Sequence, residues 1–370
     1  MSTPFPAFPI SDHFDGNRFF TPGAPRMAGF RDVAKWRLGK NKTAAPRATW
    51  PKWVDITQRP PPPRPAAGSR DIIATWVNHS TFLLQTAGAN ILFDPVFSRR
   101  CGPFGKTGPA RAHAPGVAPA ALPRIDAVCL SHDHYDHCDL PSLRWLARRD
   151  PQNPPVGITP LGNGALLRRA GFAPENIIEL DWWETREMDF GFSSGTGCQP
   201  VGLENRATLS RRHTGWQPVP LDPLPITLTP AQHWSKRLTS SRNRRLWGGF
   251  FITFPTPSAR AVYFAGDTGW HETIFRDIAA RLGAPDLAML PIGAYEPRWF
   301  MRPQHCNPAE AVRIHRELGS RQSVAMHWGA FQLTDEARDE PPRALAQALR
   351  EAGLPPGVFK VLEPGESLAV

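Results

Sequence analysis

Short apolar runs separated by polar, glycine-rich or proline-rich turns fill the chain from residue 71 onward, and this pattern predicts strands that alternate with helices. We interpret the runs at 72–84 and 91–93 as one hairpin with residues 87–90 at its turn. Further strands are expected at 125–130, 156–159, 177–180, 226–228, 261–265 and 323–326, and helices after Asp139 and near 165–170. This alternation is typical of an open sheet with helices on its faces.

Residues 1–70 follow a different pattern, because they are rich in proline and basic residues and close with RPPPPRP at 59–65. We expect an extended, polyproline-like N-terminal arm. Aromatic residues such as Phe14, Phe19 and Trp36 predict that part of this arm is ordered against the body. A single folded domain is expected over 71–370. The segment 193–223 carries TGCQPVG and TGWQPVP with little periodicity, and we predict an inserted, poorly ordered surface loop there.

Composition places the chain among folded globular proteins, with 370 residues, 41% hydrophobic residues and 13 Trp. No run of eighteen apolar residues and no basic start followed by an apolar run is found, so we expect neither a membrane span nor a signal peptide. Five scattered cysteines without a CxxC spacing are typical of free thiols in a reducing compartment. We therefore expect a cytoplasmic protein.

The formal net charge of +10 is compatible with nucleic acid, an anionic membrane surface or a phosphate-bearing substrate as a partner. The basic residues are dispersed in small groups, such as Arg99 with Arg100 and the group at 242–245, and form no long run. A solvated basic surface is the default interpretation, and nucleic acid is not the expected partner.

The densest group of metal-binding residue types is SHDHYDH at 131–137, which contains His132, His134, Asp136 and His137. Such a group is costly to bury unless a cation holds it. It follows a strand-like run and precedes a helix, and four ligands in one loop suit two ions better than one. A polar surface loop is the alternative, and it would fit a lone HxH better than this cluster.

Three further candidate ligands each follow an apolar, strand-like run in the second half of the chain, namely His233, Asp267 and His327. Strand ends meet at one edge of a sheet, so these side chains can converge on the HxHxDH loop. Asp94 also ends a strand, where it would orient a metal-bound histidine or cap the next loop. The pattern assigns no role to His79.

Five histidines and two aspartates without a thiolate favour zinc, with iron or manganese as alternatives. If Asp267 bridges, one ion takes His132, His134 and His233, and the other takes Asp136, His137 and His327. Two ions about 3.5–4 Å apart would convert a bridging water to hydroxide near neutral pH. The predicted reaction is hydrolysis by this hydroxide, with Asp136 and Asp267 as catalytic candidates.

These residues resemble the metallo-β-lactamase superfamily, and within it the group of phospholipases D that hydrolyse N-acylphosphatidylethanolamine. The stretches that carry the resemblance are LSHDHYDH at 130–137, ELDWWE at 179–184, AQHWSKR at 231–237, FAGDTGW at 264–270, LPIGAYEPRWFM at 290–301, Gln304 with His305, EAVRIH at 310–315 and MHWGAF at 326–331. HxHxDH identifies only the superfamily, whereas PIGAYEPRWFM with the Gln-His pair is specific to the narrower group.

The resemblance implies an α+β fold, an αββα four-layer sandwich of two mixed sheets packed face to face with helices outside. It also implies two zinc ions, His305 near the substrate phosphate, and attack of water on phosphorus that yields N-acylethanolamine and phosphatidate. Tyr295, Arg298 and Trp299 flank His305 in sequence and are candidate walls of the substrate pocket. Peripheral contact with a membrane is expected, and a homodimer is left open.

Three alternatives to a phospholipid substrate remain at this point. A relative that acts on a soluble phosphodiester or a sugar lactone would need the same metal ions. A tRNA-processing-type nuclease is supported by the basic charge, but the chain lacks an appended aromatic RNA platform and a dense basic arm. A metal-stabilised binding protein at a membrane surface would not require seven ligand positions that are all chemically competent.

Overall fold

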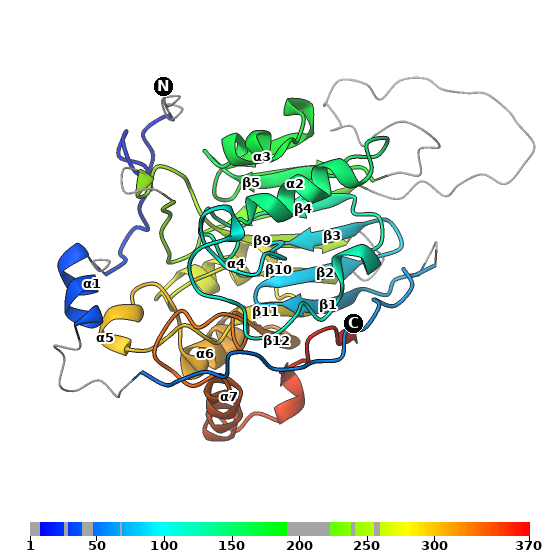
Figure 1. Ribbon diagram of the computed structural model, residues 1–370. Coiled ribbons are helices and arrows are strands. Elements are labelled where there is room, and N and C mark those ends of the chain that lie inside the picture. The colour runs from blue at the N-terminus through cyan, green and yellow to red at the C-terminus, as the bar shows by residue number, and fades with distance from the viewer. Residues whose placement is uncertain are drawn as a thin grey trace, which may run out of the picture.

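The computed structural model describes residues 8–25, 29–38, 47–66, 69–190, 223–237, 241–254 and 260–370. Within these residues the chain forms two sheets of seven strands each, and helices lie outside them (Figure 1). The α+β four-layer sandwich expected from the sequence is therefore confirmed.

The first sheet has the strand order β14-β1-β2-β3-β4-β5-β6. Its strands are β1 (Ile73–Asn78), β2 (Thr81–Gln85), β3 (Asn90–Phe93), β4 (Ala127–Cys129), β5 (Val156–Pro160), β6 (Ile177–Leu180) and β14 (Ser367–Ala369). The pairs from β14 to β3 are antiparallel and those from β3 to β6 are parallel. As a result β1, β3 and β4 run in the same direction and end at the same edge of the sheet.

The second sheet repeats this scheme with the order β13-β12-β11-β10-β9-β8-β7. Its strands are β7 (Thr185–Met188), β8 (Leu224–Thr229), β9 (Gly249–Phe254), β10 (Arg260–Phe264), β11 (Leu287–Pro291), β12 (Gln322–Met326) and β13 (Phe359–Lys360). The pairs from β7 to β10 are antiparallel and those from β10 to β13 are parallel. Consequently β8, β10, β11 and β12 also share one direction.

Helices form the two outer layers, and one helix, α1, belongs to the N-terminal arm. They are α1 (Phe30–Arg37), α2 (Leu140–Arg149), α3 (Gly164–Ala170), α4 (Ile274–Leu282), α5 (Arg298–Met301), α6 (Pro308–Leu318) and α7 (Glu340–Glu351), with short 3-10 turns at Pro103–Gly105, Pro119–Ala121, Pro174–Asn176 and Pro356–Val358. Leucines of α2 and α3 pack on the outer face of the first sheet, and α4, α6 and α7 contribute to the main core beside the second.

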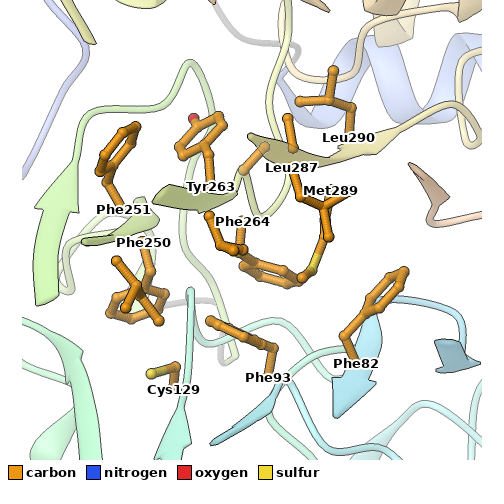
Figure 2. Close-up of a cluster of buried hydrophobic side chains, with 14 of the residues drawn as sticks. Phe82, Phe93, Cys129, Phe250, Phe251, Tyr263, Phe264, Leu287, Met289 and Leu290 are labelled. Atoms are coloured by element: carbon orange, nitrogen blue, oxygen red, sulfur yellow. The ribbon is translucent and has the colours of Figure 1, made fainter. Parts of the chain in front are cut away.

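Alternation of apolar side chains along the first sheet divides the interior into two parts, because successive residues of a strand face opposite sides. Leu83 and Leu92 face α2 and α3. Phe82 and Phe93 face the second sheet and join the main core, where the Phe93 ring stacks on Phe264 with centroids 4.6 Å apart (Figure 2). Aromatic side chains from both sheets therefore meet in the core between them.

The predicted hairpin at 72–93 was incorrect in one respect. The apolar run at 72–84 is two strands, β1 and β2, which pair with each other across a turn at His79 and Ser80. The turn predicted at 87–90 does connect two strands, but they are β2 and β3. A buried His79 and Ser80 interrupt the run only briefly, and both strands on either side are apolar, so periodicity alone did not separate them.

The described part of the N-terminal arm contacts the body. Phe14 and Phe19 are buried in the main core, and the Thr21 hydroxyl donates a hydrogen bond to the Ala231 carbonyl at 3.0 Å. The His13 ring stacks on Trp182 and lies 2.7 Å from an Asp181 oxygen. The boundary at residue 71 stays a prediction, and the insertion predicted at 193–223 lies, apart from residue 223, outside the described residues.

Among the described residues, no helix has both the length and the apolar character needed to cross a membrane.

Replacement of Phe264 with Ala should lower the free energy of unfolding by about 3–5 kcal/mol, because it leaves a cavity against Phe93 between the two sheets. Denaturant unfolding followed by circular dichroism measures the loss. Phe104→Ala, which truncates a side chain that is 69% exposed, is the matched control and should change stability by no more than about 0.5 kcal/mol. Equal losses in the two variants would contradict this view of the core.

The contact between the arm and the body should depend on pH through His13. Burial lowers the pKa of His13, but hydrogen bonds to Asp181 and Asp12 outweigh burial and raise it above 6.5. The stabilisation is therefore complete below pH 6.5 and is lost as pH rises through the raised pKa. Hydrogen exchange at residues 11–21, corrected for intrinsic rates, should increase across this range, and His13→Asn should remove the dependence. A profile that is the same in both proteins would contradict the assignment.

Candidate metal centre

All candidate ligands lie at one edge of the two sheets, at the ends of strands that run in the same direction. The HxHxDH loop follows β4, while His233, Asp267 and His327 follow β8, β10 and β12. Because the two sheets pack face to face, these strand ends come together although they are far apart in sequence. The structure thus brings together all seven residues that the sequence nominated.

The first group of donors consists of His132, His134, His233 and Asp267. The Nδ1 atom of His134 lies 2.9 Å from His132 Nε2 and 3.1 Å from His233 Nε2. Asp267 Oδ2 lies 3.8 Å from His132 Nε2 and 3.7 Å from His233 Nε2. Three imidazole nitrogens and one carboxylate oxygen therefore face a common point.

The second group contains Asp136, His137 and His327. Asp136 Oδ2 lies 3.3 Å from His327 Nε2 and 3.6 Å from His137 Nε2. The same two nitrogens lie 3.2 Å and 3.1 Å, respectively, from Asp267 Oδ2. A single oxygen of Asp267 consequently faces both groups, which is the arrangement that a bridging carboxylate requires.

These separations fit divalent ions. Two ligands of one tetrahedral ion with bonds of about 2.0–2.1 Å lie about 3.3 Å apart. Hydrogen bonds join some of these donors, but they do not satisfy all of them. Among the described residues, His137 Nε2 and Asp267 Oδ1 are buried atoms without a hydrogen-bond partner, although His137 Nε2 is only 3.1 Å from Asp267 Oδ2. The donor set of imidazoles and carboxylates is one that zinc, iron or manganese can use.

A layer of hydrogen bonds behind the donors fixes their orientation. Asp94, which follows β3, accepts hydrogen bonds from the Ser131 backbone N–H at 2.7 Å and from the Ser131 hydroxyl at 2.6 Å. His137 Nδ1 donates to the same carboxylate at 2.7 Å, so Nε2 is left to face the donors. His233 Nδ1 donates likewise to the Gln304 carbonyl at 2.9 Å. Asp94 therefore occupies the orienting position that its strand end suggested.

A buried ion pair between Asp133 and Arg245 stabilises the HxHxDH loop. Asp133 is fully buried, lies 3.1 Å from the Arg245 guanidinium, and accepts a hydrogen bond from the Lys236 backbone N–H at 2.7 Å. Arg237 donates to the carbonyls of Asp133 and Cys138. The segment that carries His233 thus braces the HxHxDH loop. Cys138 is buried and does not belong to either donor group.

The helix after the loop begins as expected, but not by the expected contact. Asp139 occupies the N-cap position of α2, yet its side chain makes no capping hydrogen bond to the helix backbone. It accepts hydrogen bonds from the Ser98 backbone and hydroxyl and from the Ser142 hydroxyl. Asp139 therefore ties the loop after β3 to α2, close to the donors.

Electrostatics keeps the imidazoles of the first group neutral and the carboxylates ionised. In the second group burial lowers the pKa of each histidine, but the Asp267 carboxylate and other acidic neighbours outweigh burial and raise the pKa of His137 well above its usual range and that of His327 to about 9. Burial, together with neighbouring imidazoles, lowers the pKa of His134 to about 3. Burial also lowers the pKa of His233 to about 4. For Asp267 burial acts in the opposite direction, but His137 and His327 outweigh it and lower the pKa well below its usual range. Neutral nitrogens and an ionised carboxylate are the forms that bind a cation.

His79 is the residue at this edge that the sequence did not nominate. It is buried, its Nε2 lies 3.2 Å from Asp136 Oδ2, and it belongs to one group of potential donors with Asp136, His137 and His327. Its carbonyl accepts a hydrogen bond from the His327 backbone N–H at 3.0 Å. His79 directly follows β1, so the same strand-end pattern would have identified it if β1 and β2 had been recognised as separate strands.

Backbone conformation also marks this edge. His79, Asp94 and His327 have φ values of 46°, 38° and 61°, although none of them is a glycine. Such conformations cost energy and persist where the surrounding structure enforces them, as at binding sites. Here the β1–β2 turn and the loop after β12 hold each other through the hydrogen bond between His327 and His79.

The residues expected to contact substrate have different surroundings. His305 is buried, and its Nδ1 lies 4.0 Å from Asp267 Oδ2 without a hydrogen-bond partner among the described residues. Tyr295 is buried and donates its hydroxyl hydrogen bond to Glu340. Arg298 pairs with Glu310 and donates to the His305 carbonyl at 2.9 Å, so it supports the backbone of His305. Trp299 is 37% exposed. Substrate contact by Tyr295 and Trp299 stays a prediction.

Comparison with known proteins places the chain in a family. The family model described as the beta-lactamase superfamily domain matches residues 89–328. An uncharacterized protein of Mycobacterium tuberculosis is 38% identical over 281 residues, which cover 75% of this chain and 64% of that protein. The N-acyl-phosphatidylethanolamine-hydrolyzing phospholipase D 1 of Caenorhabditis elegans is 33% identical over 282 residues, which cover 75% of this chain and 70% of that protein.

The solved structure of isothiocyanate hydrolase from Delia radicum gut bacteria shares the fold, with a TM-score of 0.54 and 20% identity over 80% of this chain and 98% of that one. The chain belongs to the metallo-β-lactamase superfamily, as the resemblance implied, and its clustered His and Asp residues form groups that could hold metal ions. Its relatives include N-acyl-phosphatidylethanolamine-hydrolyzing phospholipases D, while the alignment spans less than two thirds of the mycobacterial protein.

Asp94→Asn should weaken metal binding about 10–100-fold, because His137 loses the anionic acceptor that orients it. Competition with a chromogenic chelator measures the affinity, and circular dichroism verifies that the fold is kept. Asn tolerates the positive φ at this position, so the substitution tests the carboxylate and not the backbone. Asp339→Asn, which alters a carboxylate that is 71% exposed, is the matched control. Unchanged affinity in Asp94→Asn would contradict this role.

Proposed function

We propose that the chain is a binuclear-metal hydrolase that cleaves a phosphodiester bond of a phospholipid, with N-acylphosphatidylethanolamine as the substrate. The products are N-acylethanolamine and phosphatidate. The observation that carries the proposal is the single Asp267 oxygen that faces two groups of imidazole and carboxylate donors. The substrate class is supported by the 33% identity to the phospholipase D of Caenorhabditis elegans and by the stretch at 290–305.

The first ion would be held by His132, His134 and His233, the second by Asp136, His137 and His327, with Asp267 shared. We propose zinc as the metal, because the donors are five imidazoles and two carboxylates without a thiolate. When bound, two such ions supply an activated water and stabilise the negative charge that develops on phosphorus-bound oxygens.

His305 is the protein group placed to act on the substrate. Its Nδ1 points to the Asp267 carboxylate from 4.0 Å and has no hydrogen-bond partner in the described part of the chain. Burial lowers the pKa of His305 well below its usual range, so the ring is neutral at pH 7. A neutral imidazole can donate a hydrogen bond to a phosphoryl oxygen in one tautomer and accept a proton in the other. Arg298 and Glu310 hold its backbone in place.

A phospholipid substrate requires contact with a membrane surface. We propose a peripheral contact, made from the cytoplasm. The +10 charge would support it on an anionic surface.

The proposal is tested with purified protein and N-acylphosphatidylethanolamine in mixed micelles. Release of N-acylethanolamine should fall about 1,000-fold or more in the His132→Ala/Asp267→Asn protein, because a ligand of the first ion and the shared carboxylate are both lost. Elemental analysis should show the loss of metal, and circular dichroism should show an intact fold.

The matched control carries two substitutions on an exposed surface, Asp339→Asn with Arg343→Ala, and should hydrolyse the lipid at the unaltered rate. Equal release by the site variant would rule out catalysis at this centre. Hydrolysis of a soluble phosphodiester or a lactone without hydrolysis of the lipid would leave the metal centre in place and refute the substrate.

A further inference from the structure

A second candidate site lies away from the metal centre, in a cavity of about 510 Å³ between the N-terminal arm and the loop after β3. We name it the arm cavity. Four of the described residues that line it are basic, namely Arg47 and Lys52 from the arm and Arg99 and Arg100 from the loop, and Trp50 and Gln332 also line it. The described residues that line it include no Asp or Glu.

The arm is held firmly beside the cavity. The Ala48 backbone N–H donates to the Asp335 carbonyl at 2.8 Å, and the Val54 N–H donates to the Ala112 carbonyl at 2.6 Å. The Trp50 indole donates to the Glu336 carbonyl at 2.8 Å. These contacts bring the basic residues of the arm opposite those of the loop.

The four cations have few anionic partners. Lys52 has no hydrogen-bond or ion-pair partner among the described residues, and Arg100 donates only to the Gly108 carbonyl, at 2.7 Å. Arg99 donates to the Arg111 carbonyl and covers the face of Trp53, with 4.8 Å from its guanidinium carbon to the ring centroid. Arg47 reaches a carboxylate, that of Asp335, at 3.9 Å. Among the described residues, the four cations therefore form one ion pair, that of Arg47 with Asp335.

Like charges that face one another across a cavity repel, and this repulsion opposes the hydrogen bonds that hold the arm beside the loop. An anion between the arm and the loop would offset it. Guanidinium groups bind phosphate through paired hydrogen bonds, and an ammonium adds a point charge. We propose that the arm cavity binds a phosphate group, carried either by a small soluble molecule or by the headgroup of an anionic phospholipid.

This site is distinct from the metal centre, and the inference does not depend on the proposed function. No candidate metal ligand lines the arm cavity among the described residues. The two sites share a wall, because Gln332 lines the cavity while the neighbouring Phe331 ring packs edge-on against His79 with centroids 5.3 Å apart. The Ala112 N–H, which donates to the Ala330 carbonyl at 2.7 Å, joins the loop to that wall.

The test compares the metal-loaded wild-type protein with two variants that have lost the same charge. Lys52→Gln/Arg100→Gln removes two exposed cations of the arm cavity, and Arg276→Gln/Arg343→Gln removes two exposed cations from helices elsewhere. One arm of the experiment uses inorganic phosphate, followed by calorimetry and by hydrogen exchange at residues 47–54 and 99–112. The other uses sedimentation with phosphatidylcholine vesicles, with or without phosphatidylglycerol.

We expect phosphate to slow exchange at 47–54 and 99–112 in the wild-type protein, which separates this site from any phosphate bound at the metal centre. Affinity should fall about tenfold or more in Lys52→Gln/Arg100→Gln, because two charge-assisted contacts are lost, and should be kept in the control. If only vesicles that contain phosphatidylglycerol bind, with the same difference between variants, the phosphate group is that of a lipid. Equal binding by all three proteins, or equal losses in both variants, would overturn the proposal.

Discussion

The site depends on one buried carboxylate. Asp267 lies between two groups of imidazoles, and a single oxygen of its side chain is within 4 Å of histidines from both. Burial of a carboxylate is unfavourable unless cations or hydrogen bonds compensate for it. The surrounding histidines provide part of that compensation, and cations held by these donors would provide the rest. Without the Asp267 carboxylate, the two donor groups would have no ligand in common.

The two sheets explain how Asp267 reaches this position. Each sheet passes from antiparallel to parallel pairing in the same order, so the strands that precede the ligands run in one direction and end at one edge. Aromatic packing between the sheets, with Phe93 on Phe264, sets the distance between the HxHxDH loop and Asp267. The glycine before Asp267 has a positive φ, and a Cβ there would meet Ser131 at 2.9 Å. The ends of β4 and β10 can therefore approach closely, because Gly266 has no side chain to meet Ser131.

Hydrogen bonds and an ion pair behind the donors fix their orientation. Asp94 orients His137, the Gln304 carbonyl orients His233, and Asp133 with Arg245 fixes the loop from below. Two groups of described basic residues differ in their surroundings. Arg245 and Arg298 pair with buried or half-buried carboxylates and maintain the site. Those of the arm cavity have little anionic compensation, which is the physical reason to expect a ligand there.

The sequence by itself predicted the class of fold and seven candidate donors that the structure brings together in the two expected groups, because each candidate follows an apolar run and HxHxDH is dense enough to be recognised locally. Only the tertiary structure revealed His79, since its strand merges with the next in the apolar pattern and its contact with Asp136 spans 57 positions. The same limit applies to Arg298, whose role as a support for His305 depends on Glu310 in another element. It applies also to the arm cavity, because its cations come from two distant segments. Periodicity specifies which face of a strand is buried, whereas contacts between distant strand ends and loops are set by the packing of the two sheets.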